Sequence, residues 1–388
     1  VIGTAAIWSM IRLVKPLIDG FRATMKARAV QAGANAIHAR DDRDIPLWLI
    51  VLLSIVCLAM IGWLLHTFID GGTLSAMSMP LTIGGVIFVV VVGFFIATVA
   101  GYMAALIGAS NSPVSGIGIL ATLIGAVLLA TFAQPILGQQ ATRALVAFTL
   151  FAVSIVFSVA TISNDNLQDL KTGQLVGASP WRQQVALIVG VLAGSLIIPF
   201  VLNMLNHAYG FPGDPNRHAV GAPLGAPQAT LISTLANGVL NGNVPWDLIG
   251  KGVVVGVICI AVDEMFGVLK LVRLPPLAIG ISIYLPMSAT EPVIIGAICG
   301  WLYNRAMDKR SNAEMAKRFG VLLASGLVVG ESLLGIVHSG FVAWRNVEHP
   351  WALVGADFSG PSNYIGMGLF ILFTLYCYWW VSRQSKLS

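Results

Sequence analysis

The sequence has little charge for its length. Only 10% of its 388 residues are charged, whereas 57% are hydrophobic. A soluble globular domain carries about a quarter charged residues, so this chain has too little polar surface to face water on all sides. The deficit excludes a cytosolic enzyme, a nucleic-acid-binding domain and a disordered chain.

Cysteine patterns that would indicate a disulfide framework or a zinc site are also missing. The four cysteines lie inside apolar segments without C-x-x-C spacing, and the six histidines are scattered. No metal and no cofactor is therefore predicted. The net charge of +5 does not indicate a nucleic-acid partner, because no predicted face alternates basic with aromatic residues.

What the sequence does contain is a series of apolar runs of about 20 residues, the length that crosses a bilayer as a helix. We therefore expect an all-α fold, a polytopic transmembrane helix bundle. Glycines at 84–93 and 101–118 predict close helix packing rather than phosphate binding. The spans are predicted at 45–69, 82–107, 117–133, 143–163, 183–206, 247–266, 319–341 and 363–382.

Three further apolar pieces are too short or too interrupted by glycine and proline to be ordinary spans. They cover residues 229–243, 275–289 and 290–304, and the last two would form a re-entrant hairpin. Such re-entrant or broken helices are the best sequence indication of a transporter's binding region. The alternative is that they belong to full spans that the sequence defines poorly.

Lysine and arginine positions predict the orientation. With Arg12, residues 15–44, 164–182, 267–274 and 305–318 and the C-terminus in the cytoplasm, eighteen of the 22 basic residues lie on the inner side. This distribution follows the positive-inside rule for a multi-pass protein of the cell (inner, or cytoplasmic) membrane. Residues 207–228 then form an extracytoplasmic loop.

The most informative polar stretch is NDNLQDLKTG at residues 164–173. Two acids and a lysine within seven residues could form a solvated turn, cap the next helix or contact a substrate. We expect Asp165, Asp169 and Lys171 to form a motif loop within the cytoplasmic segment 164–182. Asp169 and Lys171 would hold this loop against a neighbouring span as part of a gate.

This stretch resembles the Asp-Leu-Lys-Thr-Gly signature of the oligopeptide transporter (OPT) family. GASNSPVSGIGI at 108–119, APQATLISTLANGVLNGNVPW at 226–246 and LAIGISIYLPMSATEPVIIGAICGW at 277–301 resemble family segments in the same order. QLVGASP at 174–180 replaces the Pro-Pro-Arg-containing segment of the peptide-transporting branch. The chain is therefore more similar to the prokaryotic and yellow-stripe-like branch.

The resemblance implies a secondary active symporter, generally proton-coupled, that works by alternating access. Small peptides, peptide-like molecules or metal–chelate complexes would be its substrates, with protons and the lipid bilayer as partners and a homo-oligomer as one assembly. Residues 1–388 would be one membrane-embedded transporter domain, truncated at its N-terminus. The residues alone leave a channel or pore open, and Asp263 and Glu264 leave an intramembrane enzyme as the weaker alternative.

Ionisable residues at bilayer depth are the candidates for the proton pathway, because their burial is costly. Glu331 lies in the middle of a predicted span, with His338 two turns later on nearly the same face. Glu291 lies at the apex of the predicted hairpin, where it would bind substrate or protons or cap the following helix. Glu331 could alternatively stay protonated and hydrogen-bond a neighbouring helix.

Polar uncharged residues complete the predicted substrate pathway. Asn237 and Asn241 are one turn apart in the short piece 229–243, where they could bind a peptide-like ligand or satisfy broken backbone. Ser110, Asn111 and Ser112 precede Pro113 in a polar break that ordinary turn chemistry also explains. The similarity of this break to residues 289–300 places both at one central cavity.

Overall fold

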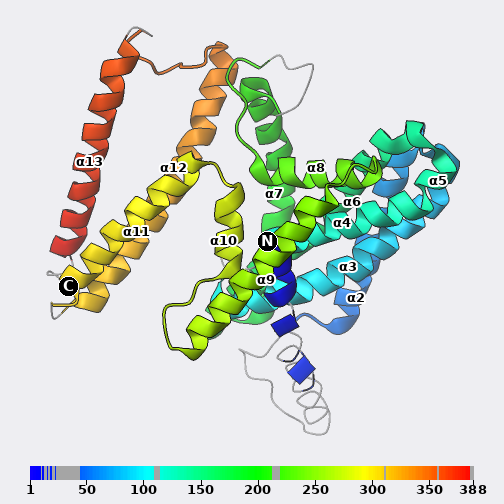
Figure 1. Ribbon diagram of the computed structural model, residues 1–388, viewed down its shortest axis with the longest axis horizontal. Coiled ribbons are helices and arrows are strands. Elements are labelled where there is room, and N and C mark those ends of the chain that lie inside the picture. The colour runs from blue at the N-terminus through cyan, green and yellow to red at the C-terminus, as the bar shows by residue number, and fades with distance from the viewer. Residues whose placement is uncertain are drawn as a thin grey trace. The chain divides into compact units, whose positions relative to one another are not determined.

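The described part of the chain is helical in all of its regular elements and divides into two compact units (Figure 1). Unit 1 contains residues 1–192 and 227–284, and unit 2 contains residues 193–226 and 285–388. The computed structural model describes residues 1–9, 11–12, 15, 18–19, 22, 44–108, 114–211, 219–309, 312–355 and 358–384.

The helices of unit 1 begin with residues 2–9, which are helical. They continue with α2 (Leu47–Ile69), η2 (Ser75–Met77), α3 (Ser78–Ile107), α4 (Val114–Phe132), α5 (Gln134–Leu137), η4 (Gln139–Ala141), α6 (Thr142–Val176), α8 (Pro227–Leu240), α9 (Trp246–Val268) and α10 (Pro276–Tyr284). Unit 2 contains α11 (Met287–Met307), α12 (Ala313–Arg345) and α13 (Ser359–Gln384). Helix α7 (Pro180–Tyr209) begins in unit 1 and ends in unit 2.

Six of these helices are long and apolar enough to cross a membrane, which confirms the predicted all-α membrane bundle. They are α2, α3, α6, α7, α12 and α13, and α4 is a shorter apolar helix. Helix α9 covers the span predicted at 247–266. It is not among the six because it contains Asp247, Lys251, Asp263 and Glu264.

Helix α6 packs against α3 and α4 at glycines, as the spacing predicted. A Cβ on Gly101 of α3 would lie 2.5 Å from Ser163 Oγ, and a Cβ on Gly118 of α4 would lie 1.7 Å from the ring of Phe157. Small residues allow such close helix approach inside a membrane. Gly85 lies against Phe148 and Gly101 against Ser163, so α6 is parallel to α3. Gly118 lies against Phe157 and Gly125 against Thr149, so α6 is antiparallel to α4, as alternating spans require.

The N-terminal helix of unit 1 is packed in the same way. Ile2 lies against Gly280 of α10, Thr4 against Gly256 of α9, and Ala6 against Gly116 of α4. Ala5 and Ala6 are almost completely buried. The first residues of the chain therefore join three helices that are far apart in the sequence.

The segment expected as the loop 164–182 is helical, and this prediction was wrong. Helix α6 continues to Val176, because residues 164–172 contain neither glycine nor proline. It ends at Gly177, whose φ of 70° is accessible to glycine, and the N–H of Ala178 bonds the carbonyl of Gly173 at 2.9 Å. Only residues 177–179 separate α6 from α7.

Three other predicted loops differ from the structure in extent or lie partly outside its description. The segment 305–318 is shorter than expected, because α11 continues to Met307 and α12 begins at Ala313. The structure does not describe most of the segment 15–44. In the segment 207–228 it does not describe residues 212–218. In the described part of 207–228, α7 extends to Tyr209 and α8 begins at Pro227.

The predicted broken segments form helices of unequal length. Helices α8 and α10 have 14 and 9 residues and are too short to cross a bilayer. Gln134 of α5 donates its side-chain N–H to the carbonyl of Leu240 at the end of α8, at 2.5 Å. Helix α11 has 21 residues and begins at Met287, three residues before the predicted start.

We expect Gly118→Ala to lower the apparent melting temperature of the purified protein. The new methyl group would overlap the ring of Phe157, and overpacking of this kind costs about 1–3 kcal/mol. Gly125→Ala in the same helix is the control, because its Cβ would lie at ordinary contact distance, 3.4 Å, from Phe88. Phe157→Leu should restore stability to Gly118→Ala. Equal melting of both glycine variants would contradict the packing argument.

Candidate functional site

The polar residues of the motif NDNLQDLKTG, at positions 164–173, lie on the last turns of α6. Asp165, Asp169 and Lys171 are exposed, and Lys171 Nζ donates to Gln174 Oε1 at 3.1 Å. Among the described residues no ion pair involves these three side chains. The expectation that Asp169 and Lys171 hold the segment against a neighbouring span is therefore not supported.

The side of α6 opposite these charged residues makes the contacts with α3. Ser163 Oγ donates to the backbone carbonyl of Ala97 in α3 at 2.7 Å, and Leu167 packs against Gly101. Asn164 is 5% exposed, and its buried Oδ1 has no hydrogen-bond partner among the described residues. The motif thus has a buried face on α3 and an exposed charged face.

The two asparagines of the short helix α8 point their amide groups back along the helix. Asn237 Nδ2 donates to the carbonyl of Ser233, and Asn241 Nδ2 donates to the carbonyl of Asn237, each at 2.8 Å. Both side chains are exposed. The carbonyl of Asn237 also accepts the backbone N–H of Asn241 at 2.9 Å, so the side-chain bond adds to a helical bond and does not satisfy broken backbone.

Glu291 does not cap α11. The helix begins at Met287 after Pro286, so the free backbone N–H groups of the first turn precede Glu291. The sequence placed the helix start too late because the polar residues Ser288, Thr290 and Glu291 resemble a turn. Glu291 lies in the second turn of α11 and is exposed.

Glu331 and His338 lie on α12 of unit 2 in different surroundings. Glu331 is exposed, and no described residue forms an ion pair or hydrogen bond with it. His338 is half-buried, and its Nδ1 lies 3.2 Å from the hydroxyl of Tyr209. The ring of Trp351 meets the His338 ring edge-on, with 4.8 Å between ring centroids.

Sequence reasoning missed both partners of His338. Tyr209 is 129 residues away from it and lies at the end of α7. Neither Tyr209 nor Trp351 is among the candidate residues that the sequence indicated. No spacing in the sequence connects these positions, so the contact is visible only in the folded unit.

The predicted site residues fall into two groups. Unit 1 holds Asn237 and Asn241 together with the three charged residues of the motif, whereas unit 2 holds Glu291, Glu331 and His338. Ser110, Asn111 and Ser112 lie outside the described residues. In the described chain no three histidine, cysteine, aspartate or glutamate side chains are placed to hold a metal ion.

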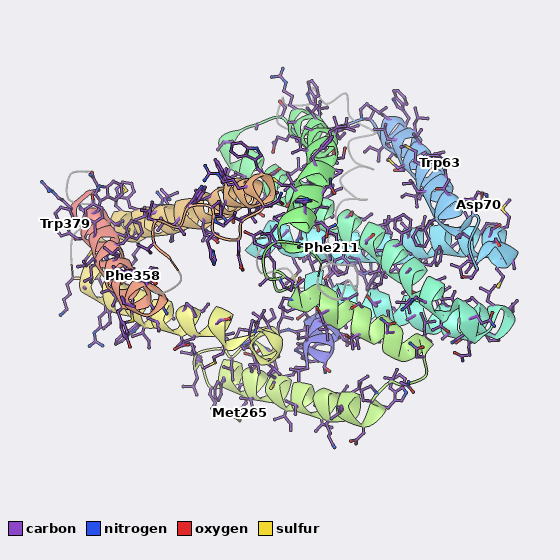
Figure 2. The ribbon with its side chains drawn as sticks, turned by 90° about the horizontal axis from the view of Figure 1, so that it is seen from above. Trp63, Asp70, Phe211, Met265, Phe358 and Trp379 are labelled. Atoms are coloured by element: carbon purple, nitrogen blue, oxygen red, sulfur yellow. The ribbon has the colours of Figure 1, made fainter. Side chains whose placement is uncertain are left out.

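A charged cluster that the sequence did not predict lies at the end of α9 that carries Met265 (Figure 2). Arg273 Nη2 bonds Asp263 at 2.7 Å and Glu264 at 3.2 Å, and Arg12 bonds Glu264 at 2.6 Å. The second oxygen of Asp263 accepts the N–H of Leu274 at 2.9 Å. The cluster joins the N-terminal helix, α9 and the connection to α10.

The side chains of this cluster are held in place by their ion-pair partners. The hydrogen bond to Asp263 is the main cause that raises the pKa of the Arg273 guanidinium above its ordinary value. A raised pKa of a cation stabilises the fold below the unfolded-state pKa, so this contribution is fully present at neutral pH. Asp263 and Glu264 are therefore structural ion-pair partners, which argues against the alternative of an intramembrane enzyme.

The cavity of unit 1 offers little to a polar ligand. It has a volume of about 280 Å³ and lies between the start of α3, the end of α4 and the start of α6. Its walls are apolar, with Leu81, Phe88, Leu129 and Phe148 among the lining residues. A peptide or a metal chelate would lose its hydration there without gaining polar partners.

Comparison with known proteins decides the family. Residues 1–342 match the family described as OPT oligopeptide transporter protein. A Haemophilus influenzae protein, named as an oligopeptide transporter, is 41% identical over 394 residues, which cover 96% of this chain and 61% of the relative. The chain belongs to the OPT family. This membership confirms the predicted resemblance.

More distant OPT relatives carry two kinds of name. A Saccharomyces cerevisiae protein, also named for oligopeptide transport, is 27% identical over 61% of the chain and 31% of the relative. An Arabidopsis thaliana protein named as a metal-nicotianamine transporter is 27% identical over 49% of the chain and 26% of the relative. No solved structure shows significant similarity to the chain.

The family assignment settles the broad class of the protein. OPT proteins are transporters and not enzymes, and the long apolar helices fit a multi-pass membrane protein. The chain spans about three fifths of the length of its Haemophilus relative.

We expect Asp263→Asn to lower the melting temperature by several degrees. Asp263 is buried, and its neutral replacement leaves Arg273 without its main partner. The control is Asp247→Asn at the start of the same helix, which removes an exposed pair with Lys251. Exposed pairs contribute only about 0–1 kcal/mol, so the control should melt almost as the parent protein does. Identical melting of the two variants would show that the cluster is not structural.

Proposed function

We propose that this OPT protein is a proton-coupled symporter that works by alternating access. The observation that carries the proposal is the family match over residues 1–342 together with the 41% identical Haemophilus relative. Short helices such as α8 and α10 support it, because broken helices near the bilayer midplane form the binding sites of many secondary transporters.

Small peptides, peptide-like molecules and metal–chelate complexes are the proposed substrates. The names of the relatives support both peptide and metal–chelate substrates. The exposed amide oxygens of Asn237 and Asn241 support a ligand with N–H or ammonium donors. QLVGASP at 174–180 favours the metal–chelate branch, because it replaces the segment typical of peptide transport.

Uptake by cells that express the protein tests this proposal. We expect accumulation of an iron chelate, a short peptide or both, driven by an inward proton gradient and abolished when the gradient is collapsed. Free iron is the control substrate and should not accumulate. Substrate flux down its own concentration gradient that does not depend on the proton gradient would identify a channel instead.

Glu331 is the proposed proton carrier, with His338 as the group that passes protons toward the outer side. Glu331 lies in the middle of α12, and two turns, about 10 Å along the axis, separate it from His338. The hydrogen bond with Tyr209 supports a relay, because it gives His338 a second group able to exchange protons. Glu291 in α11 is the rival carrier.

We expect Glu331→Gln to abolish uphill, pH-driven uptake while substrate exchange continues, because glutamine keeps the shape but cannot titrate. Glu314→Gln is the matched control, since Glu314 lies in the first turn of the same helix and outside the apolar span. Accumulation against the gradient with unchanged pH dependence in Glu331→Gln would make Glu331 structural and Glu291 the candidate.

The exposed charges of α6 are the proposed gate. Asp165, Asp169 and Lys171 leave the contact with α3 to Ser163 and Leu167, so they can meet substrate or a moving segment without disturbing that contact. In the uptake assay Asp169→Asn and Lys171→Ala should slow transport at normal membrane insertion. Unchanged transport rates in both variants would show that these charged side chains are only solvated and take no part in a gate.

The proposed location is the cell (inner) membrane, with residues 305–318 and the C-terminus in the cytoplasm. The support is the concentration of eighteen of the 22 basic residues on one predicted side. A homo-oligomer is compatible with the many exposed apolar side chains of α2 and α13, such as Trp63 and Trp379 (Figure 2).

A further inference from the structure

Unit 2 contains a cavity of about 380 Å³ between α11, α12 and α13. Polar and apolar residues line opposite ends of it. Asn304, Lys317 and Tyr378 lie at one end, whereas Leu327 and Phe370 lie at the other. The ten helical steps from Lys317 to Leu327 extend about 15 Å along α12, half the thickness of a bilayer core. The cavity thus has the depth of one lipid leaflet.

Aromatic residues place the polar end of the cavity at the membrane surface. The guanidinium of Arg305 lies 5.2 Å from the ring centre of Trp301 on α11, and that of Arg383 lies 5.4 Å from Trp379 on α13. Tryptophan and arginine at helix ends are typical of the boundary between lipid and water. Trp379 stands at this end of α13 (Figure 2).

The same end carries an excess of positive charge. Lys317 Nζ forms an ion pair with the carboxylate of Asp308 at 2.5 Å, and the Lys317 side chain also lines the cavity. Basic residues outnumber acidic ones among the described parts of 301–318 and 379–384. The basic residues are Arg305, Lys309, Lys317, Arg318 and Arg383, and the acidic ones are Asp308 and Glu314.

We propose that this cavity binds an anionic phospholipid, with the phosphate at Lys317 and an acyl chain along Leu327 and Phe370. Basic pockets between transmembrane helices on the cytoplasmic side are suited to such headgroups. The deep end does not suit a peptide or a metal chelate, because Leu323, Leu327 and Phe370 would desolvate its charges without replacing the lost hydrogen bonds. The lining of the cavity therefore favours a lipid over the proposed transport substrates.

Native mass spectrometry of the detergent-purified protein tests the site without a transport assay. Phosphatidylglycerol and phosphatidylethanolamine with identical acyl chains are the probes. We expect one phosphatidylglycerol to be retained in preference to phosphatidylethanolamine. Lys317→Gln should weaken this binding about five-fold, the loss expected for one basic contact at a membrane surface.

A second variant fills the cavity without changing its charge. A Cβ on Gly320 would lie 3.9 Å from Tyr303, so Gly320→Leu fits the helix contact and projects the larger side chain into the cavity. We expect it to abolish retention of phosphatidylglycerol. Ala324→Leu, one turn further along the same wall, serves the same purpose if Gly320→Leu lowers the melting temperature.

Two matched controls lie outside the cavity. Lys309→Gln removes a neighbouring basic residue, and Gly326→Leu adds the same side chain to α12 where no atom lies within 4 Å of the new Cβ. Both should retain the lipid as the parent protein does. Equal retention of the two lipids, or equal losses in cavity and control variants, would overturn the proposal. Displacement of the lipid by a peptide or an iron chelate would overturn it in favour of a substrate site.

Discussion

The close approach of helices at glycine is the constraint on which unit 1 depends. Apolar side chains gain little by leaving lipid for another helix, so membrane helices associate through close packing and hydrogen bonds. Gly101 and Gly118 leave the space that Ser163 and Phe157 of α6 occupy. The N-terminal helix uses Gly256 and Gly280 in the same manner, so one packing device holds both the motif helix and the start of the chain.

The order of helices in this fold could be predicted from hydropathy, because a bilayer forces every spanning segment to satisfy its own backbone. The ends of the helices could not. Hydropathy reports where a segment leaves the apolar core, whereas a helix ends where the backbone must turn. Helix α6 therefore continues through the polar motif to Val176. It ends only at Gly177, whose φ is left-handed. Helix α11 begins at Met287, before the polar residues that suggested a turn.

The sequence indicates candidate site residues but not the contacts that they make. Rare polar side chains in apolar segments are visible in a sequence, which is why Glu331, His338 and Asn237 could be selected. The partners of these side chains come from distant segments without a pattern of their own. Tyr209 contacts His338, 129 residues later in the sequence, and Arg12 bonds Glu264, 252 residues later.

The acids of the helices differ in what their protonation would cost. Asp263 accepts bonds from Arg273 and from the N–H of Leu274, so adding a proton would break contacts that hold the connection from α9 to α10. Glu264 is similarly engaged by Arg12 and Arg273. Glu331 makes no such contact in the described part of unit 2, where its side chain is exposed. Neutralising Asp263 would therefore disturb the connection from α9 to α10, whereas the same change at Glu331 would break no contact among the described residues.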